Sequence, residues 1–315
     1  MKYSSEGFSD SKRRHRRRVV SVLIIALAAV TVVSGGVLFA RARVPLLPVV
    51  ETSQSLDAVE LWQQGLYAKT EAVTTDTLSR YPMDDVSLTL RGFSRFYLAM
   101  EQVDPELTQE YLVNAVRDLR RVLLLSSPQL EPQVRYVLGK AFFHRGAFYI
   151  PAAIREMEIA HDRGIDQLDL LEYLALAHRE LGNLDRAIAY FQMAINRDGE
   201  EIHRLSLADL LIIQGQYQSA DDLLQGVISQ TSDLILQQHG MLSRGKMLRA
   251  MGDHDRSLEE FDAVLEINES SAEAHFQRGE TYLAMDRTDR ARFEWREALR
   301  LNPNHIESFQ RLQDY

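Results

Sequence analysis

Hydrophobic residues form one long uninterrupted run near the amino terminus and are more scattered afterwards. From Val19 to Ala40 there are 22 consecutive residues without a charge, mostly Val, Leu, Ile and Ala. As a helix this run spans about 33 Å, which is enough to cross a bilayer. From residue 51 onward no sustained alternation of apolar and polar residues is present, which argues against strands. The pattern predicts one transmembrane helix over 19–40, followed by an all-α domain.

Basic residues flank the apolar run unequally. Six of them precede it closely and only Arg41 and Arg43 follow it. Because cytoplasmic flanks carry the excess of Lys and Arg, residues 1–18 are predicted to be a cytoplasmic basic tail. The rest of the chain is then expected outside the cytoplasm, in the periplasm if the membrane is a bacterial inner membrane. The six preceding residues are Lys12, Arg13, Arg14, Arg16, Arg17 and Arg18.

A cleaved signal peptide is the alternative to a permanent anchor. Ala40 and Ala42 form an Ala-x-Ala pattern ahead of Arg43. The apolar core of a signal peptide is about 7–15 residues, shorter than this run, so an uncleaved anchor is favoured while cleavage stays open. Residues 41–55 contain Pro45 and Pro48 and no helical period, which predicts an extended stalk.

Small and aromatic residues recur with a fixed spacing in the carboxyl-terminal part. Two antiparallel helices approach closely where small residues face each other, and large side chains fill the space beside them. The positions in residues 272–304 are Gly279, Tyr282, Ala291, Trp295, Ala298 and Pro303. The same order recurs upstream, and from Ala153, Met157 and Ala160 to Ala187, Phe191 and Ala194 the interval is 34 residues in all three cases. A non-repeating helical bundle, the alternative, gives no reason for that interval.

This spacing resembles the tetratricopeptide repeat, a helix-turn-helix unit of 34 residues. The resemblance covers residues 51–315 and implies a helical solenoid of about seven units. Two degenerate units are expected in 51–130, the second with an insertion at Asp104 and Pro105, and five further units in 131–305. Residues 306–315, amphipathic through Ile306, Phe309 and Leu312, are expected to form a terminal capping helix.

Charge and composition narrow the class of partner. The whole chain has a net charge of −9, but residues 51–315 carry 27 basic and 43 acidic residues, a net charge of −16. Such a domain repels phosphate backbones, so no nucleic-acid partner is expected. There is no cysteine, and no glycine-rich phosphate loop, His-Glu-x-x-His or Gly-x-Ser-x-Gly motif. We therefore predict no catalytic residue, no metal and no cofactor.

The resemblance also implies where a protein partner binds. In this family the first helices of the units form a concave wall that receives an extended peptide or a helix. A lysine–asparagine clamp for a partner's carboxyl terminus, used by one subset of the family, is not expected because the asparagine is missing. Carried over by position, the wall comprises Phe93, Phe96, Tyr97, Tyr136, Lys140, Phe143, His144, Glu172, Leu176, Arg179, Leu242, Lys246 and Arg249.

These observations predict a membrane-anchored scaffold that binds proteins in envelope assembly, secretion or quality control and catalyses nothing. One alternative is an array that self-associates. Another is a ligand-binding or catalytic module in residues 51–130, which would need convergent polar groups.

Overall fold

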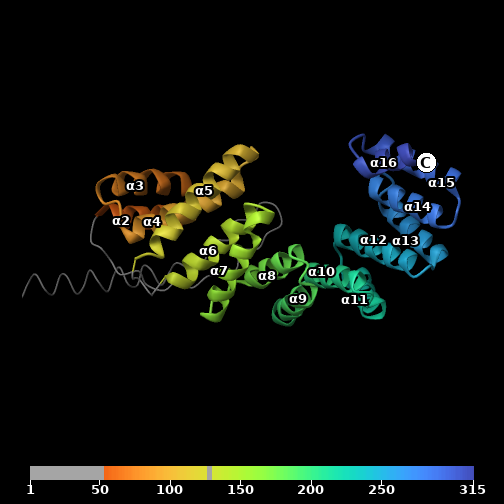
Figure 1. Cartoon of the computed structure of the whole chain (residues 1–315), viewed down its shortest axis with the longest axis horizontal. Coiled ribbons are helices and arrows are strands. Elements are labelled where there is room, and N and C mark those ends of the chain that lie inside the picture. The colour runs from red at the N-terminus through yellow and green to blue at the C-terminus, as the bar shows by residue number, and fades with distance from the viewer. Residues whose placement is uncertain (1–52, 126–129) are drawn as a thin grey trace, which may run out of the picture. The chain divides into compact units, whose positions relative to one another are not determined.

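The described part of the protein is helical throughout. The computed structural model describes residues 53–125 and 130–315, which contain fifteen α-helices and one short 3-10 helix (Figure 1). The predicted tail (1–18), transmembrane helix (19–40) and stalk (41–55, apart from its last three residues) lie outside this part. Within it, no helix combines the length and the apolar character needed to cross a bilayer. The first described helix already begins at Ser53.

The chain divides into two compact units, the first ending at Asn183 and the second beginning at Leu184. The first unit contains α2 (Ser53–Gln63), α3 (Tyr67–Arg80), α4 (Asp85–Glu101), α5 (Pro105–Val122), α6 (Glu131–His144), η1 (Ala147–Tyr149), α7 (Ile150–Asp162) and α8 (Leu168–Glu180). The second contains α9 (Leu184–Asp198), α10 (Glu201–Ile213), α11 (Tyr217–Gln230), α12 (Leu234–Ala250), α13 (His254–Ile267), α14 (Ala272–Ala284), α15 (Thr288–Leu301) and α16 (Ile306–Asp314).

Helices pair in sequence order, α2 with α3, α4 with α5 and α6 with α7 in the first unit, and α10 with α11, α12 with α13 and α14 with α15 in the second. We call the even-numbered helices α2 to α14 first helices and the odd-numbered helices α3 to α15 second helices. The turn between the two helices of a pair often needs a left-handed residue, which glycine adopts at least cost. Gly215 and Gly252 have φ values of +74° and +83° there, and Asp286, with φ +59°, takes the equivalent place between α14 and α15.

Small residues allow the paired helices to approach closely, as predicted. A Cβ atom on Gly279 would lie 2.5 Å from Trp295 Nε1 and 3.2 Å from the carbonyl oxygen of Ala291. Ala291, Trp295 and Ala298 are completely buried. The positions selected by spacing alone are therefore the contacts that hold α14 against α15.

First helices also contact one another along each unit. In the first unit α2 touches α4, α4 touches α6 and α6 touches α8; in the second, α10 touches α12 and α12 touches α14. Side chains from several first helices consequently share one face of the first unit, and this arrangement positions the candidate site.

Two predicted details were wrong. The insertion predicted at Asp104 and Pro105 is a helix start, since the Asp104 carboxylate accepts the Glu106 backbone N–H at 2.9 Å and Pro105 opens α5. Two residues of the apolar stripe of the predicted capping helix, Ile306 and Phe309, face outward, with exposed fractions of 64% and 55%, and only Leu312 is partly buried. α16 instead docks through the buried Ser308 and through Arg311, which binds Glu280 at 2.6 and 2.9 Å.

Candidate functional site

Three first helices of the first unit, α4, α6 and α8, bring aromatic and charged side chains together. On α6, Tyr136, Lys140 and His144 follow one another at intervals of four residues and so lie on one side of the helix. On α8, Asp169 and Tyr173 have the same spacing. Because α6 contacts α8, these two rows meet.

Lys140 occupies the centre of the cluster. Its Nζ donates to Asp169 Oδ2 at 2.6 Å and to the Tyr136 hydroxyl at 3.3 Å, and the Tyr136 hydroxyl donates to Asp169 Oδ1. The same Nζ lies 5.3, 5.1 and 4.8 Å from the ring centroids of Phe96, Tyr136 and Tyr173. Lys140 is only 4% exposed, so its charge is satisfied inside the protein by one carboxylate and three rings.

A second layer of rings lies over this centre. His144 Nε2 is 2.8 Å from the Tyr173 hydroxyl, and Phe143 meets the Tyr173 ring edge to face at 5.2 Å. Tyr97 packs against Phe96 with ring centroids 5.4 Å apart. We call Tyr97, Phe143, His144 and Tyr173 the aromatic face; all four are partly exposed. Their mutual contacts restrict their rotamers before any partner arrives.

Burial keeps these side chains uncharged at neutral pH. Burial, together with the smaller effect of the nearby Lys140 charge, lowers the pKa of His144 to about 4. Burial also raises the pKa values of Tyr97, Tyr136 and Tyr173 above their usual range, and the Asp169 carboxylate adds to each shift. The phenol groups therefore retain their protons, and the aromatic face presents neutral hydrogen-bonding groups.

The structure places the ten predicted wall residues of the first unit at two depths. Tyr97, Phe143 and His144 lie at the surface, as do Glu172, Leu176 and the exposed Arg179. The other four are buried and do not present themselves to a partner: Phe93, Phe96, Tyr136 and Lys140. The burial has a simple cause, since adjacent first helices stack closely enough to cover residues near their line of contact.

The three predicted wall residues of the second unit do not form a cluster of this kind. Leu242 packs in the hydrophobic core with Phe261 and Val264. Lys246 pairs with Glu273 at 2.9 Å. Arg249 donates to the Gln277 carbonyl oxygen at 3.1 Å, and burial lowers the pKa of its guanidinium.

Three residues of the cluster were missed by the sequence-based prediction: Tyr67, Asp169 and Tyr173. Tyr67 stacks on Tyr97 with centroids 4.8 Å apart and comes from a second helix, α3, which the prediction did not consider. Asp169 and Tyr173 do lie on a first helix. Their four-residue spacing, which matches that of Tyr136 and Lys140, is the signal that could have found them.

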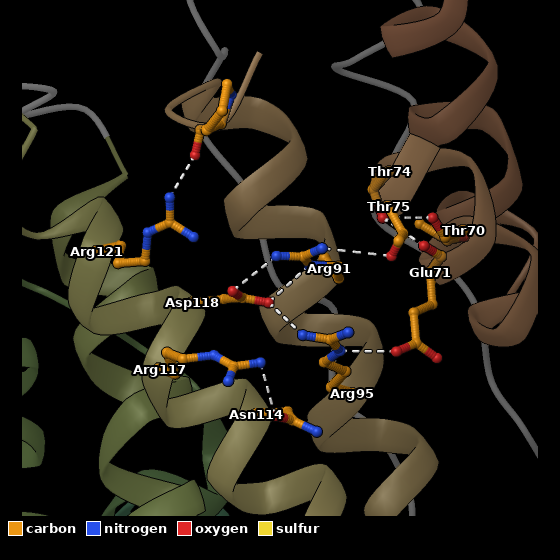
Figure 2. A network of polar contacts seen from close by, with 11 residues as sticks. Thr70, Glu71, Thr74, Thr75, Arg91, Arg95, Asn114, Arg117, Asp118 and Arg121 are labelled. Atoms are coloured by element: carbon orange, nitrogen blue, oxygen red, sulfur yellow. Dashed lines mark hydrogen bonds and ion pairs between the residues drawn. The ribbon is translucent and has the colours of Figure 1, made fainter. Parts of the chain in front are cut away.

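Polar groups also converge within residues 51–130, as the ligand-binding alternative requires (Figure 2). Arg91 binds both oxygens of Asp118 at 2.8 and 2.9 Å and approaches the Thr75 hydroxyl at 3.4 Å. Arg95 joins Asp118 to Glu71, each at 2.7 Å. The four charges balance and Asp118 is completely buried, so these groups satisfy one another. No group of three or more His, Asp or Glu suited to a metal ion occurs among the described residues.

Family comparison identifies the repeats. Models described as tetratricopeptide repeat match residues 272–305 and, in two overlapping segments, 150–202 and 174–233, and a model described as TPR repeat matches residues 245–286. The chain carries tetratricopeptide repeats. The matches include α14 and α15, where the spacing of small residues is most complete, as well as α8. The predicted tetratricopeptide resemblance and the all-helical fold are therefore confirmed.

Solved tetratricopeptide structures share the fold at low sequence identity. The carboxyl-terminal part of a repeat protein from Cytophaga hutchinsonii aligns with a TM-score of 0.60 and 17% identity over 82% of this chain and 99% of that one. A tetratricopeptide repeat protein from Parabacteroides merdae aligns with a TM-score of 0.55 and 17% identity over 82% and 96%.

A chain of the APC/C hetero-tetramer Cut9–Hcn1 aligns with a TM-score of 0.51 and 16% identity over 84% of this chain. This chain spans about half of that protein, 49% of its length. At such identities these likenesses show the fold alone. No curated protein sequence matches the chain significantly.

Proposed function

We propose that this protein is a membrane-anchored tetratricopeptide scaffold that binds a protein partner on the aromatic face of its first unit. Tetratricopeptide arrays are typically interaction scaffolds, because stacked units present extended surfaces. The anchor is the apolar run 19–40, and the repeats lie on the extracytoplasmic side of the membrane. The partner then belongs to envelope assembly, secretion or quality control.

The aromatic face is the observation that carries this proposal. Tyr97, Phe143, His144 and Tyr173 present partly exposed rings from neighbouring helices. Rings dominate binding energy at protein interfaces because they bury much apolar area with few rotatable bonds. Here their contacts with Phe96 and with one another have already fixed the rotamers, which lowers the entropic cost of binding. Arg179 and Glu172 at the edge provide charges for orientation.

Photocrosslinking in native membranes tests the proposal. A photoreactive phenylalanine replaces Phe143 on the aromatic face or, as the matched control, Phe148, which is 87% exposed on η1. We expect a distinct adduct from position 143 and none of that mass from position 148. Mass spectrometry of the adduct identifies the partner.

A further substitution separates binding at the face from chance proximity. Tyr173→Ala removes the ring that packs against Phe143 and should abolish the adduct at position 143 while the helical circular dichroism is retained. Equal labelling at positions 143 and 148 would refute the aromatic face as the binding site. An adduct with the mass of two copies of this chain would instead establish the self-associating array.

A further inference from the structure

We infer that one end of the first unit is a docking surface for an anionic lipid bilayer. This inference rests on the proposed membrane anchor and adds a second surface to the proposed function, separate from the aromatic face. Six residues form the surface, which we call the basic edge: Tyr81, Met83, Arg117, Arg120, Arg121 and Leu124.

Exposed apolar side chains from two segments meet at the basic edge. Tyr81 and Met83, in the turn between α3 and α4, are 58% and 48% exposed, and Leu124, just after α5, is 80% exposed. Arg121 on α5 (Figure 2) joins the two segments, because its Nη2 donates to the Pro82 carbonyl oxygen at 2.5 Å and lies 3.3 Å from Met83 Sδ. The Leu124 backbone N–H donates to the Arg121 carbonyl oxygen at 3.1 Å, so Arg121 connects the chain at Leu124 with the turn that holds Tyr81 and Met83.

The arginines of the basic edge differ from the paired arginines of the network at Asp118. Arg117 and Arg120 are exposed, and neither has a carboxylate partner in residues 53–125 or 130–315. Arg117 donates only to the Asn114 side chain, at 2.8 Å.

The acidic groups nearest the basic edge already have hydrogen-bonding partners. Asp84 and Asp85 accept the backbone N–H groups of Ser87 and Val86 at the start of α4. Asp76 pairs with Arg80. These hydrogen bonds do not cancel the negative charges, but at this end of the unit the four arginines Arg80, Arg117, Arg120 and Arg121 outnumber the three aspartates, whereas in residues 53–183 acidic residues outnumber basic ones, 19 to 13.

The directions of the helices place the basic edge at the end of the first unit that is connected to the predicted anchor. Successive helices α2 to α5 contact one another and are joined by short turns, so their directions alternate. The start of α2, the end of α3 and the end of α5 consequently lie at the same end of the unit. Residues 41–52, which connect the apolar run to Ser53, reach at most about 43 Å even when fully extended. The end of the unit that holds the basic edge is therefore the end tethered to the membrane.

The chemistry of the basic edge fits a phosphate-bearing bilayer surface. Arginine is attracted to anionic headgroups and buries its aliphatic stem along apolar surface. Tyrosine prefers the headgroup level of a membrane. The opposite end of α4 and α5 provides a contrast: Val103 is 97% exposed there but adjoins Asp104, with Glu101 and Glu106 close in sequence. That end offers apolar surface with the opposite charge.

A fluorescence experiment on the full chain tests the inference. The chain has no cysteine, so Leu124→Cys and Val103→Cys each accept a single environment-sensitive label. Each labelled protein is reconstituted into phosphatidylcholine nanodiscs with or without phosphatidylglycerol. We expect spin-labelled lipids to quench the label at position 124 when phosphatidylglycerol is present, and to leave the label at position 103 unquenched in both lipid mixtures. Arg117→Glu with Arg120→Glu should abolish the quenching at position 124.

Each other outcome overturns the inference. Quenching of neither label means that the basic edge stays away from the bilayer, and equal quenching of both means that the contact is unspecific. Quenching that does not depend on phosphatidylglycerol would show that electrostatic attraction does not hold the basic edge at the bilayer. A label at position 124 that becomes less quenched as the protein concentration rises would show that a second copy of the chain covers the basic edge. Retention of the chain in membranes after an alkaline carbonate wash is scored separately, so failure of the anchor is distinguished from failure of the docking.

Discussion

Gly139 marks the closest approach between α6 and α7. A Cβ atom there would collide with Met157 Cγ and come within 3.1 Å of the Ala153 carbonyl oxygen, which cannot move without shifting α7. Gly139→Ala should therefore lower the free energy of unfolding by about 1–2 kcal/mol, because overpacking exceeds the gain in helix propensity.

Gly226 provides the matched control for this substitution. It lies within α11, and a Cβ atom there would meet no atom within 4 Å. Gly226→Ala should raise the free energy of unfolding by about 0.5–1 kcal/mol. Urea unfolding followed by circular dichroism measures both variants, and effects of the same sign would contradict the role assigned to Gly139.

His144 makes stability depend on pH. Its pKa in the folded protein is lowered to about 4, mainly by burial. Because an unfolded chain has an ordinary histidine pKa of about 6.5, it binds the proton first as the pH falls, and stability declines between pH 6.5 and 4. Between pH 8 and pH 5 this loss should amount to about 2 kcal/mol. His144→Gln should reduce the difference in urea midpoint between these pH values, and an unchanged difference would show that His144 titrates normally.

The partly exposed residues of the aromatic face were easier to predict from the sequence than the buried residues beneath them. Position within the repeat selected Tyr97, Phe143 and His144, which are partly exposed in the structure, while their binding of a partner stays a prediction. It could not show that Lys140 is buried, because that depends on Asp169, 29 residues away, which lies opposite only after α6 and α8 stack. Packing between neighbouring repeats decides which residues of a repeat wall are exposed. The residue spacing within one repeat contains no information about that packing.

At the scale of helices, a recurring ion pair joins the first and second helix of a unit. In four helix pairs, a carboxylate on the second helix binds an arginine on the first helix. In each case the carboxylate residue directly precedes the large buried residue of the second helix, such as Phe261 or Trp295. The four ion pairs are Arg91 with Asp118, Arg135 with Glu156, Arg244 with Glu260 and Arg278 with Glu294. These carboxylate side chains are at most 15% exposed.

Two of these arginines also bind a carboxylate of the preceding second helix. Arg244 also binds Asp221 on α11 at 2.7 Å, and Arg278 binds Asp262 on α13 at 2.8 Å. One guanidinium thus connects three consecutive helices and helps to fix how one pair stacks on the next. Such planar, multidentate contacts suit arginine better than lysine.

Asp118 tests the energetic importance of these pairs. Asp118→Asn leaves Arg91 and Arg95 buried without a full counter-charge, which should cost about 3–5 kcal/mol of unfolding free energy. Asp76→Asn breaks the Arg80 pair, whose side chains are 56% and 52% exposed, and should cost no more than about 0.5 kcal/mol. Thermal unfolding of the two variants makes the comparison, and equal costs would show that the network at Asp118 contributes no more than a surface pair.

At the scale of the whole molecule, the repeat interval predicted the order of the helices better than the amphipathic pattern predicted how α16 packs. The interval follows from close helix contacts that recur in every unit, such as Gly279 against Trp295. α16 packs against α15 and binds Glu280 of α14 through Arg311, and its amphipathic pattern alone does not show which side makes these contacts. Ile306 and Phe309 illustrate this, since they are apolar and yet exposed.

The proposed membrane orientation is the property of the whole chain that is most directly testable. Since the native chain lacks cysteine, single cysteines at Ser4 in the basic tail and at Val103, which is 97% exposed, report the two sides of the membrane. In spheroplasts of a bacterium expressing the chain, a membrane-impermeant maleimide should label Val103→Cys at once and Ser4→Cys only after permeabilisation, because the basic flank is retained in the cytoplasm. The reverse pattern would place the repeats in the cytoplasm. A product shortened by about 42 residues, as a signal peptide ending in the Ala-x-Ala pattern requires, would show that the chain is released instead of anchored. In that case the basic edge would have no tether holding it at the bilayer, whereas the aromatic face would remain a binding surface for a soluble partner.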